Sequence, residues 1–341
     1  MADPLPPELD RYSRQVRFPH LGEEGQRSLL ASRVLICGCG ALGSVLANTL
    51  ARAGIGHIRL VDRDVLETSN LQRQVLYDED DVTAGLPKAI AAQRRLARIN
   101  STIEIEAHVT DVDAANISGF LEGVDMILDG TDNFETRFLL NDAAVSRGLP
   151  WVYGGCIGAE GQCMTILPGE TPCLRCLHAE APPPGTMATC DTAGILGPII
   201  NVIASIEACE ALKILSGNRA EVSRNLTVID LWDSTFRSLN LDGLKAAGNC
   251  PCCDRHEFPW LSGERGSHTA VLCGRNAVQL TLPERQELSL EQLEQKLRGV
   301  GQVTRNRFLL RLTVDRYTLT VFPDGRAIVA GTEEITEART V

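Results

Sequence analysis

The chain has 341 residues, enough to bury a large core and to hold more than one structural unit. Its net charge is −11, which argues against a protein that binds nucleic acid without sequence preference, because such binding needs a basic face. The first residues are polar and proline-rich, and the longest apolar run, residues 195–215, is interrupted by charged side chains. We therefore expect no signal peptide, no membrane span and a cytoplasmic location.

The most informative stretch is residues 34–62, which have the pattern of a strand, a glycine-rich turn, a helix and a second strand. The turn contains Gly38, Gly40 and Gly43, and the second strand ends at Asp62. Small residues let the backbone approach a polyphosphate, and the helix N-terminus offers N–H groups to it. A carboxylate at Asp62 can accept hydrogen bonds from ribose hydroxyls. The stretch predicts a nucleotide site but does not distinguish NAD from ATP.

Strand and helix patterns alternate through the first half of the chain, which predicts a Rossmann-like, mostly parallel sheet with helices on both faces. The later strands 226–232 and 236–241, together with 162–167, predict an antiparallel extension. Residues 179–193 lack periodicity and contain three consecutive prolines, so we expect a loop over the site. The other predicted elements of this part are strands at 103–107, 124–129 and 151–155 and helices at 87–99 and 134–147.

The composition changes after Leu261, and residues 262–267 have the character of a linker. Beyond them a helix at 290–297 is surrounded by short strand patterns, which predicts a small α+β appendage. We therefore divide the chain into a domain of residues 1–261 and a second domain of residues 262–341. The strands predicted for the second domain are 278–282, 308–314, 317–322 and 327–330.

Two C-x-x-C motifs, Cys173–Cys176 and Cys250–Cys253, supply the four thiolates that a structural tetrahedral zinc site requires. They lie far apart in the chain, so only the fold can bring them together. Cys252 is a possible substitute ligand, and a pair of redox motifs is the alternative. We expect one Zn²⁺ that links the end of the domain to its middle.

Cationic and amide side chains follow the glycine turn. Asn70, Gln72 and Gln74 offer orienting hydrogen bonds, and Arg73 can form paired bonds to a phosphate. Lys88, at the start of a predicted helix, adds a compact charge. Taken singly, each of these side chains can be an ordinary solvent-exposed residue. Together they favour a triphosphate over a dinucleotide.

Two further positions have open interpretations. Asp132 follows a predicted strand of the parallel sheet, where ligands bind, and can hold Mg²⁺. Asp132 or Asn133 can equally be the N-cap of the following helix. Cys190 lies near a helix start, where a lowered pKa would make it a nucleophile, but a half-buried structural thiol is the alternative.

Taken in chain order, these residues resemble the MoeB/ThiF/HesA family, the bacterial relatives of ubiquitin-activating enzymes. The resemblance covers roughly residues 8–260 and also includes the opening Arg11-Tyr12-Ser13-Arg14-Gln15. Ala41 departs from it, since glycine is common there. The appendage is too short for the rhodanese domain of larger members, and its one cysteine, Cys273, lacks the context of that domain's active loop.

The resemblance implies an adenylyltransferase that uses ATP and Mg²⁺ and keeps a structural Zn²⁺. Its partner would be a small ubiquitin-like sulfur-carrier protein that ends in Gly-Gly. The terminal carboxylate attacks the α-phosphate, which gives an acyl-adenylate and pyrophosphate. Sulfur is added later, either by a partner such as a sulfurtransferase or cysteine desulfurase or through an enzyme cysteine.

The resemblance also assigns residue roles. The arginine at the position of Arg14 reaches the ATP of a neighbouring subunit in this family, which implies a homodimer. The residues expected to act in catalysis are Arg14, Arg73, Lys88, Asp132 and Cys190. The residues expected to contact the nucleotide or its metal are Gly38, Gly40, Ala41, Gly43, Asp62, Asp64, Ser69, Asn70, Gln72, Arg73, Lys88, Asp132 and Asn133.

Three alternatives remain at this point. An NAD-dependent oxidoreductase would use the glycine turn and Asp62 but not Arg73, Lys88 or the cysteines. A relative of the same fold that dehydrates a modified adenosine in tRNA conflicts with the acidic charge balance. A non-catalytic scaffold would not need the cations. The sequence leaves open the carrier, and so whether the pathway is molybdopterin, thiamin, tRNA thiolation or an amino-acid route. It also leaves open the roles of Cys190, Cys273 and the appendage.

Overall fold

The structure is a computed structural model that describes residues 5–182, 190–266, 269–272, 276–280 and 288–341. These residues divide into two units. The first consists of residues up to 182 and of residues 195–264. The second consists of the residues from 265 onward together with 190–194. The domain boundary predicted after residue 261 stays a prediction.

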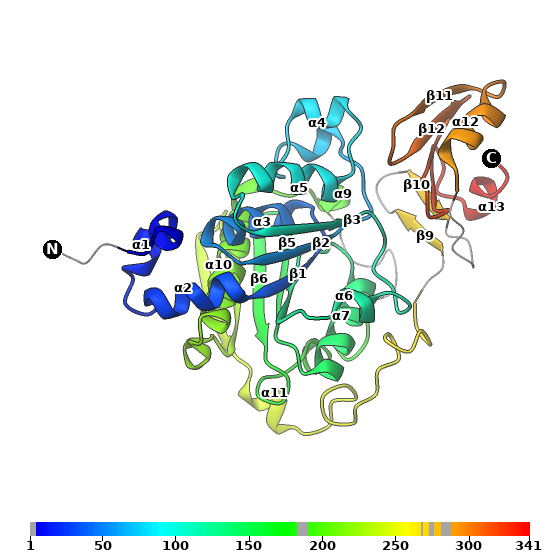
Figure 1. Cartoon of the computed structure of the whole chain (residues 1–341). Helices are drawn as coiled ribbons and strands as arrows, with labels where there is room; N and C mark the ends of the chain where they lie inside the picture. The colour runs from blue at the N-terminus through cyan, green and yellow to red at the C-terminus, as the bar shows by residue number, and fades with distance from the viewer. Residues whose placement is uncertain (1–4, 183–189, 267–268, 273–275, 281–287) are drawn as a thin grey trace. The chain divides into compact units, whose positions relative to one another are not determined.

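The first unit is built on an eight-stranded sheet with the strand order β3-β2-β1-β4-β5-β6-β7-β8 (Figure 1). The five strands from β3 to β5 pair in parallel, and those from β5 to β8 pair antiparallel. The predicted mostly parallel sheet with an antiparallel extension is confirmed. In chain order the strands are β1 (Arg33–Cys37), β2 (His57–Val61), β3 (Glu104–His108), β4 (Met126–Asp129), β5 (Trp151–Ile157), β6 (Glu160–Ile166), β7 (Asn225–Asp230) and β8 (Thr235–Asn240).

Helices cover both faces of this sheet. On one face α3 packs against both α5 and α10, and α7 lies on the opposite face. In chain order the α-helices of the first unit are α1 (Ser13–Val16), α2 (Gly22–Ala31), α3 (Ala41–Ala53), α4 (Glu79–Thr83), α5 (Lys88–Ile99), α6 (Ile117–Phe120), α7 (Phe134–Arg147), α8 (Leu174–Leu177), α10 (Gly197–Leu215) and α11 (Asp242–Ala246). Short 3₁₀ turns occupy Pro7–Tyr12, Thr68–Asn70 and Arg219–Glu221.

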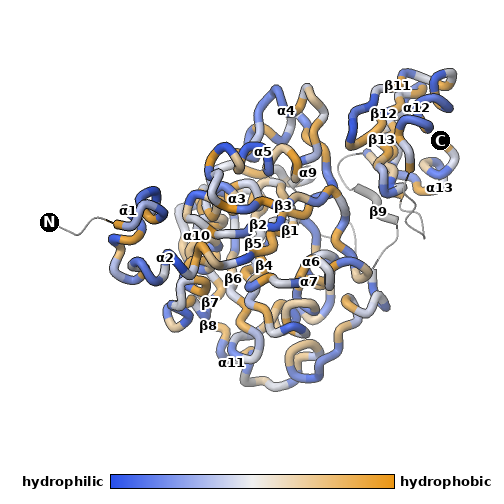
Figure 2. The backbone as a smooth tube through the Cα atoms, in the orientation of Figure 1, coloured by the Kyte–Doolittle hydropathy of each residue, from blue (hydrophilic) through white to orange (hydrophobic). Residues whose placement is uncertain are grey.

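Local sequence signals explain where α3 and α7, the two helices next to the site, end. Both α3 and α7 end at a glycine in the left-handed conformation, Gly54 with φ +86° and Gly148 with φ +68°. The strands between them are buried on both faces, as expected for the centre of a parallel sheet. Figure 2 shows hydrophobic residues concentrated on these central strands.

The segment before α10 differs from the prediction. Residues 179–193 were expected to form a loop, but the last four, Cys190–Ala193, form the short helix α9. Residues 183–189 lie outside the described part of the chain. Among the described helices, none combines the length and the apolar content that crossing a membrane requires.

The second unit contains a six-stranded antiparallel sheet in the order β11-β12-β13-β14-β10-β9. Leu319 packs against both the α12 and the α13 clusters, so the two helices share one face of this sheet. Cys273 lies outside the described residues. The elements of the unit's C-terminal part are β9 (Thr269–Leu272), β10 (Ala277–Leu280), α12 (Leu290–Leu297), β11 (Gln302–Arg305), β12 (Leu310–Val314), β13 (Tyr317–Val321), β14 (Ala327–Ala330) and α13 (Ile335–Ala338).

Candidate nucleotide site

The glycine turn lies where the strand order of the sheet reverses, between β1 and β4, which is where ligands bind in open α/β sheets. Gly38 has φ +90°, a conformation that favours glycine. A Cβ atom at Gly43 would collide with the carbonyl oxygen of Gly38, and so would one at Gly130 in the turn after β4. These glycines are therefore required for the two turns to approach each other.

Gly40 has a different reason to be glycine. A Cβ atom there would meet only Gln74 Nε2, at 3.9 Å. No close approach within the protein therefore requires a glycine at this position. The space that a side chain would fill beside the turn is open to a ligand. The side chain of Gln74 is buried, and its Oε1 has no hydrogen-bond partner among the described residues. Gln72, which we expected at the nucleotide, is exposed. The structure thus brings Gln74 to the turn.

Asp62 holds the turn in place. Its carboxylate accepts hydrogen bonds from the backbone N–H groups of Cys39 and Asp64, both at 2.6 Å. Tyr77, which the sequence analysis did not single out, donates its hydroxyl to the carbonyl of Cys39 at 2.6 Å. Burial raises the pKa of Asp62, and the charge of Lys88 opposes that rise. Asp62 therefore lies directly beside the glycine turn.

Lys88 is only 3% exposed, although it is a lysine. Its Nζ lies 2.8 Å from Asp64 Oδ2, and its backbone N–H donates to the Asp64 carbonyl at 2.9 Å. A buried lysine is costly unless it is paired, so this contact fixes the ammonium near the end of β2. Arg73 is half-buried and donates to the carbonyl of Ser69 at 2.9 Å.

Arg63 is a second cation at this edge that the sequence analysis missed. Its guanidinium lies 2.8 Å from Asp111 and 3.7 Å from Asp64. Burial lowers the pKa of Arg63, but the fields of Asp111, Asp64 and Asp132 raise it above its usual value. Asp132 therefore belongs to the same electrostatic cluster, although it follows a different strand. The signal in the sequence was an arginine between two aspartates at a strand end.

Asn133, and not Asp132, is the N-cap of α7. Its Oδ1 accepts from the backbone N–H of Thr136 at 2.8 Å. Asp132 is exposed, and in the described part of the structure no hydrogen bond to its carboxylate is found. The capping explanation that the sequence left open for Asp132 is thereby removed.

A buried ion pair fixes the turn that carries Asp132. Asp129 accepts from the backbone N–H and the hydroxyl of Thr131, at 2.8 and 2.7 Å, and from Arg137 Nε at 3.1 Å. Arg137 Nη2 donates to the carbonyls of Thr131, at 2.8 Å, and Gly154, at 3.0 Å. Arg137 was not predicted; its only signal was an arginine in the first turn of the helix, directly before the apolar residues Phe138, Leu139 and Leu140.

Asn70 is buried, and its Oδ1 accepts from the backbone N–H of Glu67 at 3.1 Å. The side chain therefore has a structural role in the turn before Arg73, and its neighbour Ser69 is exposed. The first turn of α10 also lies against this segment. A Cβ atom at Gly197 would be 3.2 Å from the carbonyl oxygen of Gln72.

Arg14 is remote from the glycine turn of its own chain. It lies on α1, where Gln15 donates to the carbonyl of Ala53 at 2.8 Å, so α1 contacts the C-terminal end of α3. The glycine turn is at the N-terminal end of the same 13-residue helix. At 1.5 Å per residue, the two ends are about 20 Å apart.

The four predicted cysteine ligands meet in the structure. The Sγ atoms of Cys173, Cys176, Cys250 and Cys253 all lie within 4.8 Å of one another. The shortest separations are 3.4 Å between Cys176 and Cys253 and 3.6 Å between Cys173 and Cys250. A tetrahedral zinc with bonds of about 2.3 Å needs sulfur atoms about 3.8 Å apart. The geometry therefore fits a structural metal ion.

Cys252 is not part of this cluster. It is fully buried, and its Sγ accepts from Asn141 Nδ2 at 3.2 Å. Asn141 Nδ2 also lies 3.7 Å from Cys173 Sγ, and Asn141 Oδ1 accepts from the backbone N–H of Leu174 at 2.8 Å. Asn141 thus orients the first C-x-x-C motif from α7, as residues around metal ligands commonly do.

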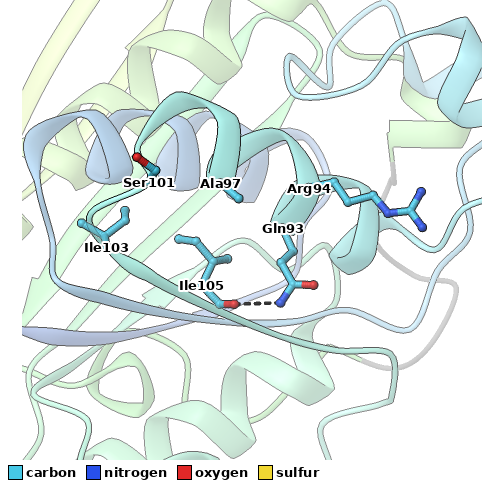
Figure 3. A pocket seen from close by; sticks show the side chains of 6 residues that line it. All are labelled: Gln93, Arg94, Ala97, Ser101, Ile103 and Ile105. Atoms are coloured by element: carbon cyan, nitrogen blue, oxygen red, sulfur yellow. Dashed lines mark hydrogen bonds between the residues drawn. The ribbon is translucent and has the colours of Figure 1, made fainter.

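A cavity of about 380 Å³ lies elsewhere, between α5 and the edge strand β3. Figure 3 shows isoleucine side chains at 103 and 105 on one side and the Arg94 side chain pointing away from them. Gln93 donates to the carbonyl of Ile105 at 2.8 Å. None of the described residues that line this cavity carries a carboxylate or a thiol, so we place the candidate site at the glycine turn.

Comparison with known proteins gives a family for this arrangement. The model of the ThiF family matches residues 12–252, which include the glycine turn, the Asp132 turn and three of the four clustered cysteines. The chain belongs to the ThiF family. The family predicted from the motifs is therefore confirmed.

Three similar proteins illustrate the extent of the match to this ThiF-family chain. The sulfur carrier protein ThiS adenylyltransferase of Bacillus subtilis (strain 168) is 44% identical over 332 residues, 97% of each chain. The SAMP-activating enzyme E1 of Haloferax volcanii is 40% identical over 246 residues, 72% of this chain and 89% of that one. The crystal structure of E. coli MccB with ATP has a TM-score of 0.58 and 26% identity, covering 70% of this chain and 74% of that chain.

Proposed function

We propose that this protein uses ATP to adenylate the C-terminal carboxylate of a small sulfur-carrier protein. The observation that carries the proposal is the convergence of the glycine turn, Asp62, Lys88 and the Asp132 turn at one edge of the sheet. It occurs in a chain that is 44% identical, over nearly its whole length, to a ThiS adenylyltransferase.

The chemistry explains why cations are needed. A carboxylate that attacks the α-phosphate of ATP meets a negatively charged target, so the site must neutralise charge and hold both groups in line. Lys88 and Arg73 are assigned to the phosphates, and Asp62 to the ribose. Asp132 would hold Mg²⁺, which supplies further charge neutralisation when bound. The products are the acyl-adenylate of the carrier and pyrophosphate.

We propose a homodimer in which Arg14 serves the nucleotide of the other subunit. The separation of about 20 Å between the two ends of α3 supports this, because Arg14 lies at the end away from its own glycine turn. We also propose Zn²⁺ in the cysteine cluster and a role for Cys190 in the later sulfur step. Only the backbone of Cys190, the first residue of α9, is described.

ATP–pyrophosphate exchange tests the main proposal. Purified protein is assayed with a panel of ubiquitin-like carriers that end in Gly-Gly, and each carrier is also supplied with its terminal carboxylate amidated. We expect exchange with at least one free carrier and none with its amidated form, since the amide removes the nucleophile. Binding of NADH in place of ATP, with no exchange for any carrier, would favour the oxidoreductase alternative.

A further inference from the structure

Glu207 is a buried acid for which the proposed reaction has no use. It lies in the middle of α10, is 0% exposed, and neither carboxylate oxygen has a hydrogen-bond partner among the described residues. Glu210, one turn further along the same helix, is the opposite case. Its oxygens lie 2.6 Å from Lys213 Nζ and 2.8 Å from the backbone N–H of Ser223. The isolation of Glu207 is therefore not a general property of acids on this helix.

Gly154 in β5 makes room for Glu207 on one face of the sheet, and Arg137 lies near Gly155 on the other face. A Cβ atom at Gly154 would collide with Glu207 Oε1. A Cβ atom at Gly155 would lie 3.6 Å from Arg137 Nη2, and the same Nη2 donates to the carbonyl of Gly154 at 3.0 Å. Glu207 and Arg137 thus touch the same short piece of backbone from opposite sides.

The charges around Glu207 decide its protonation state. The charges that act on Glu207 are those of Asp129 on β4 and, across the sheet, of Arg137 on α7, and the thiol of Cys163 on β6 interacts with it electrostatically. The helices α2 and α3, which also contact α10, bury no charged residue. Arg137 is therefore the single cation among these groups for the two carboxylic acids Asp129 and Glu207, and it is already paired with Asp129. Burial and the charge of Asp129 raise the pKa of Glu207 well above its usual value, and Arg137 opposes this only in part.

We propose that Glu207 is a positioning residue of the adenylation site, kept uncharged beneath Gly154 so that Arg137 keeps its bonds to Asp129 and to the Thr131 carbonyl. An ionised Glu207 would draw the guanidinium toward itself and away from the turn that ends in Asp132. The inference rests on the proposed function, because the turn matters only if Asp132 takes part in adenylation. It gives a structural purpose to an acid that otherwise has none.

The test compares wild type, Glu207→Gln and Glu210→Gln in ATP–pyrophosphate exchange from pH 6 to pH 10. At pH 7 we expect Glu207→Gln to keep kcat within about twofold, since glutamine copies the shape and the neutral state. At the alkaline end wild type and Glu210→Gln should lose kcat by about tenfold per pH unit beyond the ionisation, while Glu207→Gln does not. The KM for ATP should not change. Superimposable profiles, or a much slower Glu207→Gln at pH 7, would overturn the inference.

Thermal unfolding gives a readout that does not depend on activity. Folding raises the pKa of Glu207. Its contribution to the free energy of unfolding is therefore complete below the pKa of the unfolded chain and is lost as the pH rises through the pKa of the folded protein. Glu207→Gln should therefore become more stable than wild type as the pH rises, and equal melting curves at every pH would refute the neutral state. If no carrier supports exchange in wild type, the proposed function fails separately from this result.

Discussion

Asp132 and Asn133 show how two adjacent polar residues divide structural and chemical roles. Either can cap a helix, so the sequence could not separate them. In the structure the cap is Asn133, which accepts from Thr136, and Asp132 is left exposed within the field of Arg63. The same reasoning separates Gln74, buried against the glycine turn, from the exposed Gln72. At the scale of single residues, hydrogen-bond partners decide the assignment.

A matched pair of variants tests this division. Asp132→Asn should lower carrier-dependent exchange by about 10²-fold and leave the melting temperature nearly unchanged, because the exposed carboxylate accepts no hydrogen bond from any described residue. Asn133→Ala should instead lower the free energy of unfolding by about 1 kcal/mol through loss of the cap. Exchange rates and denaturant unfolding of both variants provide the comparison. A large loss of stability in Asp132→Asn would mean that the carboxylate is structural after all.

At the scale of elements, long periodic segments were predicted well and several short ones were missed. The helices α7 and α12 have the predicted bounds, because their apolar residues recur at the period of the element. The short strand β14 also has the predicted bounds, because the Pro323-Asp324-Gly325 turn comes before it. The four-residue strands β9 and β11 and the helix α9 were missed. Such short elements carry too few residues for a period to be recognised, and pairing with neighbouring strands determines them.

The two C-x-x-C motifs join elements that are distant in the chain, and metal removal tests that link. Wild type should contain about one equivalent of zinc, and Cys253→Ser should lose it together with thermal stability, because the ion connects the α8 region to the end of the first unit. Cys252→Ser is the control, since serine can still accept from Asn141 and the four ligands remain. Elemental analysis and melting curves report the result. A metal-free preparation that is fully folded would contradict the zinc assignment.

At the scale of the whole molecule, the position of Arg14 argues for assembly. The residue sits beside the C-terminal end of α3, and a cation at that distance cannot contact a phosphate at the other end. A second copy related by two-fold symmetry can supply it, and symmetric dimers are the commonest oligomers. The role that we propose for Arg14 therefore requires a dimer.

Mixed dimers distinguish action within a subunit from action between subunits. Arg14→Ala and Asp132→Asn homodimers should each be strongly impaired. Co-expressed with different tags, they should recover about a quarter of wild-type exchange, because random pairing puts half of the dimers in a mixed form with one intact site. If Arg14 acts on its own subunit's nucleotide, both sites of the mixed dimer stay defective and no activity returns. The doubly tagged fraction contains only mixed dimers, so exchange measured on it should reach about half of wild type if Arg14 acts between subunits and should be absent if it acts within its own subunit.

The sequence alone was enough for the family, the glycine turn between the first strand and its helix, the mostly parallel sheet and the clustering of the four cysteines. Each of these follows from the spacing of residues that are close in the chain, such as glycines between a strand and a helix, or two cysteines three positions apart. The tertiary structure decided what depends on neighbours from elsewhere in the chain: the approach of the Gly38 and Gly130 turns, the burial of Lys88, the pairing of Arg137 with Asp129 and the isolation of Glu207. Burial and partners are properties of the packed chain, so no local pattern records them.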